Sequence, residues 1–174
     1  MSEVLPRPAA DEYAPYYAGY IAGIPDGDLL TTLEHQLDDA LVLFGSIGEE
    51  HGNHAYAEGK WTIKEVMAHV IDAERIFAYR ALRIARGDQT PLPSFDENAF
   101  AAESLAGNRT LIDLAEEFGH VRRASLALLR PLTEEVAARR GTASGYPVSA
   151  RAAAWILAGH AAHHLRLLRD RYIG

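Results

Sequence analysis

The sequence has no cysteine among its 174 residues. Disulfide bonds, thiolate metal sites and a cysteine nucleophile are therefore all excluded. Positive charge is also scarce, because 17 Lys and Arg stand against 24 Asp and Glu and leave a net charge of −7. A surface of this sign repels phosphate backbones, so we expect no nucleic-acid partner.

Long apolar runs and targeting signals are missing as well. No uncharged stretch approaches the ~20 residues that are needed to cross a bilayer. The first residues, MSEVLPRPAADEY, lack the basic-then-apolar order of a signal peptide. We therefore expect a cytoplasmic protein with no membrane partner. Apolar residues still make up 48% of the chain, which suits one globular domain over residues 1–174.

Strand signals are few, and helical periodicity dominates the pattern. Four long segments repeat apolar residues at intervals of three and four, which predicts four helices with one apolar face each. These segments are residues 29–47, 62–86, 111–129 and 150–172. A short helix is expected at 97–104, within the long connection between the second and third helices. Residues 1–25 should form a wrapped N-terminal arm with one irregular turn near 13–21. The fold class is therefore all-α, with a four-helix bundle as its architecture.

Helix starts are marked by capping residues. Thr62 and Glu65 have the spacing of a capping box, and Thr110 with Asp113 repeats it. Ser149 is the expected cap of the last helix. These signals agree with the apolar periodicity, so the starts of the last three helices are the best-defined boundaries in the sequence.

The segment GHAAHH, residues 159–164, holds the densest group of histidines. On a helix, His164 lies about 40° around from His160 and about 6 Å along it. Two imidazoles so placed can meet one ion, as in helical HxxxH sites. Both lie in the apolar stripe of this helix, whereas His163 lies on its shoulder, at the edge or surface. The alternative is a pair of core histidines bonded to carbonyls, carboxylates or water, since buried imidazoles need partners.

His69 is the candidate third ligand. It lies at the margin of the apolar stripe of the second helix and points towards the bundle interior, as His160 and His164 do. Three imidazoles from two facing helices suit a divalent Zn, Ni or Fe ion with open positions for water or substrate. A purely structural role for His69 is the alternative.

Charged residues of the second helix could serve the same site. Asp72 and Arg83 flank the His69 side, where they would orient ligands, hold an anionic substrate, or simply form surface ion pairs. Arg80 and Arg83 lie about 16 to 21 Å from His69 along the helix, which is long for contact with a metal-bound ligand. Arg166, half a turn past His164 but turned outward, is the other candidate cation.

The order of these motifs resembles the DinB/YfiT-like metalloprotein superfamily. The matching stretches are GKWTIKEVMAHVIDAER (59–75) and AGHAAHHLRLLRDRY (158–172), and PLPSFDENAF (91–100) resembles the DinB_2 subgroup. The resemblance implies an up-up-down-down bundle with a long crossover between helices 2 and 3. It also implies a divalent metal site with His69, His160 and His164 as ligands.

The resemblance leaves the function open between two classes. Relatives include S-transferases and isomerases that depend on a low-molecular-weight thiol, and others are labelled hydrolases. A metal-dependent enzyme acting on a small molecule is therefore one hypothesis, with thiol transfer slightly favoured over hydrolysis. The absent cysteine fits, because the thiol would come from the cosubstrate. The alternative is a non-enzymatic stress-response or binding module with a structural or vestigial metal. A homodimer is also expected, since a short bundle with a long crossover has apolar surface to cover.

Overall fold

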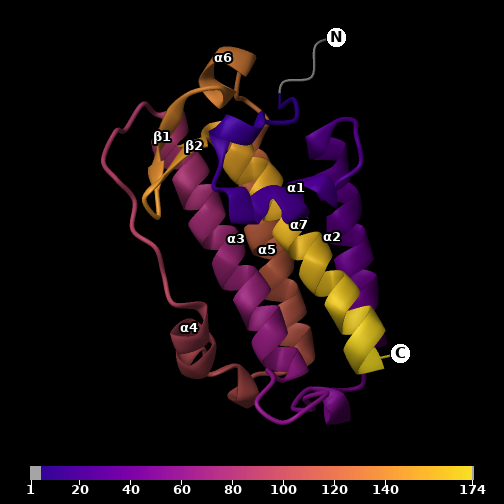
Figure 1. Cartoon of the computed structure of the whole chain (residues 1–174). Helices are drawn as coiled ribbons and strands as arrows, with labels where there is room; N and C mark the ends of the chain where they lie inside the picture. The colour runs from indigo at the N-terminus through magenta and orange to yellow at the C-terminus, as the bar shows by residue number, and fades with distance from the viewer. Residues whose placement is uncertain (1–4, 174) are drawn as a thin grey trace.

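Four long helices lie side by side in the computed structural model, which describes residues 5–173 (Figure 1). They are α2 (Leu29–Ser46), α3 (Ile63–Ala85), α5 (Leu111–Leu129) and α7 (Ala150–Leu167). All four coincide with the segments predicted from apolar periodicity, and the all-α class is confirmed. The last predicted helix differs at its end, because the chain continues from Leu168 to Ile173 as the π-helical stretch η5.

The direction of the helices defines the topology. In the orientation of Figure 1, α2 and α7 run downwards whereas α3 and α5 run upwards. Helix α3 packs mainly against α7 and α5, while α2 packs against α5 and α7. Helices α2 and α3 therefore lie diagonally, as do α5 and α7, whereas the parallel pairs α3–α5 and α2–α7 are neighbours. Taken around the bundle, two neighbouring helices run up and two run down, and the expected crossover joins the parallel helices α3 and α5.

Capping interactions fix the helix starts as expected. The Thr62 hydroxyl accepts from the Glu65 amide while the Glu65 carboxylate accepts from the Thr62 amide, which completes the capping box of α3. Thr110 caps α5 and Ser149 caps α7 in the same way, through amides three residues on. At the other end of α3, Gly87 has a φ of +79°, a left-handed conformation that glycine adopts without strain.

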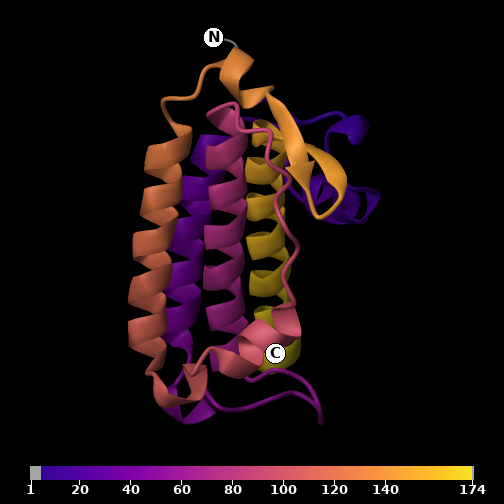
Figure 2. The ribbon, with the colours of Figure 1, turned by 90° about the vertical axis from the view of Figure 1, so that its left-hand side faces the viewer.

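The connections at the two ends of the bundle carry short elements. After α2 the chain forms the turn η3 (Glu49–His51), and the crossover carries α4 (Glu97–Glu103), close to the predicted short helix, and then η4 (Ala106–Asn108). After α5 comes the short helix α6 (Glu134–Ala137). In Figure 2 the crossover descends along the outside of the bundle to α4 at the lower end.

A two-stranded hairpin, β1 (Arg140–Ala143) and β2 (Tyr146–Ser149), was not predicted. This segment lies between the helices expected at 111–129 and 150–172, and no strand was expected there. Ser144 and Gly145 form its turn with φ of 53° and 82°, the pattern of a tight hairpin turn. Leu92 of the crossover pairs with Ala143, so a third chain segment joins the edge of the hairpin.

The N-terminal segment wraps across α7, as expected. It contains the turns η1 (Ala10–Glu12) and η2 (Pro15–Tyr17) and the short helix α1 (Ala18–Ala22). The Trp155 indole N–H donates to the carbonyl of Leu5 at 2.9 Å, and Arg151 donates two hydrogen bonds to Glu12. These contacts hold the segment against the upper half of α7.

The buried apolar side chains form two clusters along the bundle. One cluster surrounds Trp155 and Phe77, and the other surrounds Phe118 and Met67. Along α7, Ala158 belongs to the first cluster and Ala161 to the second, so the clusters meet near His160. None of the helices described is long and apolar enough to span a membrane.

Candidate metal centre

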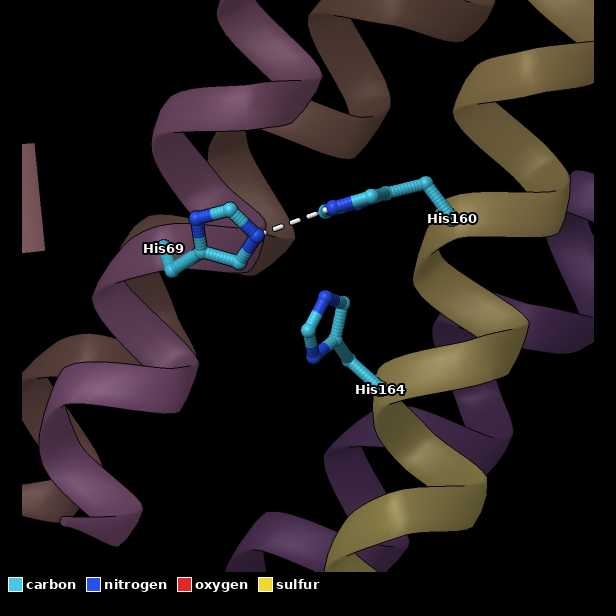
Figure 3. Close-up of side chains that lie close together, drawn as sticks. All are labelled: His69, His160 and His164. Carbon is cyan, nitrogen blue, oxygen red and sulfur yellow. Dashed lines mark hydrogen bonds between the residues drawn. The ribbon is translucent and has the colours of Figure 1, made fainter. Parts of the chain in front are cut away.

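Three histidines from α3 and α7 converge where the two apolar clusters meet (Figure 3). One ring nitrogen from each of His69, His160 and His164 lies within 4.8 Å of the others. Their exposed fractions are only 3%, 6% and 7%. The antiparallel packing of α3 on α7 brings residues 91 positions apart into contact. The structure thus brings together all three residues singled out in the sequence.

The hydrogen bonding of this cluster is incomplete. The Nε2 atoms of His69 and His160 lie 2.9 Å apart, so one of them must carry a proton for the pair to bond. The Nδ1 atom of His164 is buried without a partner in residues 5–173. An unpaired buried nitrogen costs free energy. The group contains imidazoles only, and a divalent ion of the Zn, Ni or Fe type fits a set of nitrogen donors.

Burial keeps these imidazoles neutral at neutral pH. Desolvation lowers the pKa of His69 to about 4. Burial, with the neighbouring His69 and His163, lowers the pKa of His164 to about 3. The pKa of His160 is also well below its ordinary value, again mainly because of burial. Neutral imidazole is the form that binds a metal, so the site needs no deprotonation before an ion enters.

Aromatic rings surround the cluster. Trp61 packs against His69 with ring centroids 4.7 Å apart, and Tyr20 of α1 meets the His160 ring edge-on at 5.6 Å. Phe77, two turns after His69, lies 5.9 Å from the His160 ring. From the sequence alone, none of these three aromatic residues was connected with the site. The position of Tyr20 depends on how the N-terminal segment packs. Such packing produces no periodic pattern in the sequence, so only the structure reveals it.

His163 lies at the edge of the site, as predicted. Its ring packs against Tyr20 at 5.4 Å and is half-buried, outside the group of three. Arg166 is exposed on the same side of α7. A cavity of about 340 Å³ between α1 and α7 is lined by both residues and by Tyr20.

The two residues expected to flank His69 make contacts elsewhere. Asp72 lies 3.9 Å from Arg75, and Arg83 pairs with Asp88. These contacts therefore favour the interpretation that Asp72 and Arg83 form ion pairs, over a role in orienting ligands or holding an anionic substrate. Glu74 and Arg122 of α5 form a pair that was not predicted; both are fully buried, and two hydrogen bonds of 2.7 and 2.8 Å join them.

Part of the chain matches a relative of known name in sequence. A protein of Oceanobacillus iheyensis named "Putative metal-dependent hydrolase" is 30% identical over 59 residues. That match spans 33% of the chain and about a third of the relative, 34% of its length.

Two solved structures share the fold. One is YfiT from Bacillus subtilis, described as a probable metal-dependent hydrolase with an unusual four-helix bundle topology. It matches with a TM-score of 0.73 and 19% identity, over 91% of this chain and 93% of that one. The other is a mycothiol-dependent maleylpyruvate isomerase, with a TM-score of 0.68, 17% identity, and coverage of 84% and 61%.

The family assignment comes from the sequence itself. The model of the DinB superfamily matches residues 32–168, which include all three histidines and all four long helices except the first few residues of α2. Since the matched region covers most of the chain, this protein belongs to the DinB superfamily.

Proposed function

We propose that His69, His160 and His164 bind one divalent metal ion, and that the protein is a metal-dependent enzyme acting on a small molecule. The observation that carries the proposal is the convergence of three buried, neutral imidazoles, one with a nitrogen that no described group satisfies. Three protein ligands are typical of catalytic sites, which keep a further position open, whereas structural sites use four.

The charge of the bound ion would decide which chemistry the site can support. A divalent ion lowers the pKa of a water or thiol that reaches its open position. Neutral imidazoles leave the full positive charge of such an ion available for this purpose. The rings of Trp61, Tyr20 and Phe77 limit the access of bulk water and lower the local dielectric.

We favour a low-molecular-weight thiol over water as the nucleophile. The histidine group contains no carboxylate that could act as a general base. A thiol, with an ordinary pKa of about 8.5, loses its proton to solvent far more readily than water does. Its sulfur would form a bond to an electrophilic carbon of the substrate while the bond from that carbon to a leaving group breaks, and the leaving group would depart with that electron pair. The mycothiol-dependent neighbour in fold supports this choice.

Hydrolysis is the second candidate. The names of the Oceanobacillus relative and of the YfiT structure support it, because both refer to a metal-dependent hydrolase. In that case water would occupy the open coordination position of the ion, and the substrate would be an ester or an amide.

The decisive experiment incubates metal-loaded protein with an electrophile and a panel of thiols, and separately with esters and amides. Saturable, metal-dependent conjugation that disappears in His69→Ala supports thiol transfer. Turnover of esters or amides without any thiol supports hydrolysis. Activity in neither panel, with the metal still bound, supports the non-enzymatic binding module.

A further inference from the structure

The cavity between α1 and α7, beside the metal centre, has the size of a ligand site. Its volume of about 340 Å³ is at the lower end of the range of about 300–1,000 Å³ that is typical of small-molecule sites. Two polar side chains that lie outside the group of three histidines, His163 and Arg166, line it. The cavity therefore combines room for a small molecule with polar groups that have no role in metal binding.

Part of the cavity wall is bare backbone. Gly19 and Gly23 of α1 lie on one side, four residues apart and so on one face of that helix, and Gly159 of α7 lies on the other. A Cβ at Gly19 would meet nothing within 4 Å, so the space beside it is open. The rings of Tyr16 and Tyr20 form two further walls. Space between aromatic rings and bare backbone suits the planar body of an aromatic ligand.

The polar end of the cavity is basic. In residues 5–173 no acidic side chain lines it, and none lies within 4.0 Å of the Arg166 guanidinium. Burial and the nearby charge of Arg166 lower the pKa of His163, so these two side chains lie close together. Burial and the charge of Glu97 in α4 raise the pKa of Tyr20, but Glu97 does not line the cavity. One guanidinium balances one negative charge and matches a carboxylate in its fork geometry.

Tyr20 belongs both to the cavity and to the surroundings of the metal centre. Its ring lines the cavity, packs against His163 at 5.4 Å and meets the His160 ring edge-on at 5.6 Å. The ring of His163 in turn lies 5.0 Å from that of His164. A ligand in the cavity would therefore contact α1 and α7 together and hold Tyr20 against the histidines.

We propose that the cavity between α1 and α7 binds a small aromatic carboxylic acid, with its carboxylate at Arg166 and His163 and its ring against the two tyrosines. This site is separate from the metal and does not depend on the proposed function. Its effect on the metal centre does rest on that function. Because the acid would fix α1 against α7, it should raise the affinity for the metal, and bound metal should raise the affinity for the acid by the same factor.

The test titrates benzoate into the metal-free protein and measures the heat of binding. Saturable binding at one site per chain is expected. Arg166→Gln should weaken it at least tenfold, because the positive charge and the fork are lost. Arg169→Gln is the matched control, since Arg169 is exposed one turn further along the chain and does not line the cavity. It should bind benzoate as the wild type does.

A second pair of variants tests the cavity itself without changing any charge. Gly19→Leu should fill part of the open space and abolish binding. Gly45→Leu on α2 is its control, because a Cβ there also meets nothing within 4 Å but lies in a different groove. Equal affinity in Gly19→Leu and the wild type would place the acid elsewhere.

Uncharged and non-aromatic analogues separate the two parts of the proposal. Benzamide should bind at least tenfold more weakly than benzoate, since it lacks the negative charge, and acetate should bind more weakly because it lacks the ring. Benzamide binding as well as benzoate would refute the role of Arg166. Acetate binding as well as benzoate would refute the aromatic walls, and a wild type that binds no benzoate would refute the site.

The link to the metal has its own measurement. The affinity for zinc is measured with and without saturating benzoate, and at least a twofold gain is expected, which Arg166→Gln should remove. A gain that persists in Arg166→Gln would mean that benzoate ligates the ion directly. If benzoate binds and the zinc affinity is unchanged, the cavity site stands and the coupling through Tyr20 is refuted. If zinc does not bind at all, the proposed function fails while the benzoate titration still decides the cavity site.

Discussion

His160 and His164 stand on one face of α7 because they are four residues apart, and His69 meets them because α3 is the neighbour of that face. Such periodicity can be read from sequence, so the candidate ligands were predictable. The position of Tyr20 beside His160 and the pairing of Glu74 with Arg122 could not be predicted, because both depend on how distant segments of the chain pack. Arg80 also shows this limit, because it is far from His69 along α3, yet Phe77 alone lies between its guanidinium and the His160 ring, at 5.6 Å and 5.9 Å.

At the residue scale, replacing any one of the three histidines by Ala should remove most of the bound metal. Two imidazoles hold a divalent ion far more weakly than three, and each ligand contributes separately. Elemental analysis of protein purified without a histidine tag, with about one ion per chain expected in the wild type, measures the effect. His163→Ala is the control and should keep its metal. Equal loss from His163→Ala would contradict the assignment of ligands.

Glu12 provides a pH-dependent prediction at the same scale. Burial alone would raise its pKa, but hydrogen bonds from Arg151, Ser149 and the Ala9 amide lower it to about 2. A carboxyl with a folded pKa below its unfolded value stabilises the fold above the unfolded pKa, and the stabilisation is lost as pH falls towards the folded pKa. Glu12→Gln should therefore cost up to about 3 kcal/mol at pH 7 and much less near pH 2.

Urea unfolding of both proteins at pH 7, 4.5 and 2.5 checks this. The difference in unfolding free energy should shrink steadily over that series. A constant difference across the series would mean that the Glu12 carboxylate charge contributes nothing and that only the shape of the side chain matters.

At the scale of elements, the helices were predicted by capping residues and apolar periodicity, whereas the hairpin was not predicted. Four residues per strand are too few to show alternation, and Ser144–Gly145 alone did not outweigh the surrounding helical pattern. The strands form because Leu92 of the crossover and the start of α7 hold both ends, which is tertiary information. Short strands of this kind depend on their neighbours more than on their own sequence.

The contact between α1 and α7 leads to a prediction about one glycine. A Cβ at Gly159 would lie 2.2 Å from the carbonyl oxygen of Tyr20, so α1 would have to move away from α7. Gly159→Ala should therefore destabilise the protein by about 1–3 kcal/mol. In Gly45→Ala the new Cβ meets nothing within 4 Å, and a small gain of about 0.5–1 kcal/mol is expected in a helix.

Denaturant unfolding of these two variants provides the measurement. Because Tyr20 also packs on His160, Gly159→Ala should in addition weaken metal retention, whereas Gly45→Ala should not. Wild-type stability in Gly159→Ala would show that α1 is not fixed against α7 by this contact.

At the scale of the whole molecule, the crossover determines the arrangement. It lets α3 and α5 run parallel, which leaves α7 antiparallel to α3 (Figure 1). His160 and His164 of α7 then lie opposite His69 of α3 (Figure 3). The four helices could be predicted from the sequence alone, but their order around the bundle came from the family resemblance. Periodicity defines which face of a helix is buried and says nothing about which helix covers it.

The outer face of α2 and α5 leads to the last prediction, a homodimer. A groove of about 750 Å³ lies between these helices, with Leu41 and Phe44 on one side and Ile112 on the other. Ile112 is 69% exposed. Glu116 and Arg123 also line the groove, two turns apart on α5. In an interface with two-fold symmetry the same patch meets itself, so a patch that carries both charges could pair each glutamate with the arginine of the other chain.

Sedimentation equilibrium at micromolar concentration should then give twice the mass of one chain. Ile112→Glu should shift the protein to monomers, because it would bury an unpaired charge in the interface. Leu105→Glu is the matched control, since Leu105 is also 69% exposed but does not line the groove, and it should remain dimeric. A wild-type protein that sediments only as a monomer would refute the dimer. Loss of the dimer in Leu105→Glu alone would instead place the interface at the lower end of the bundle, near η4.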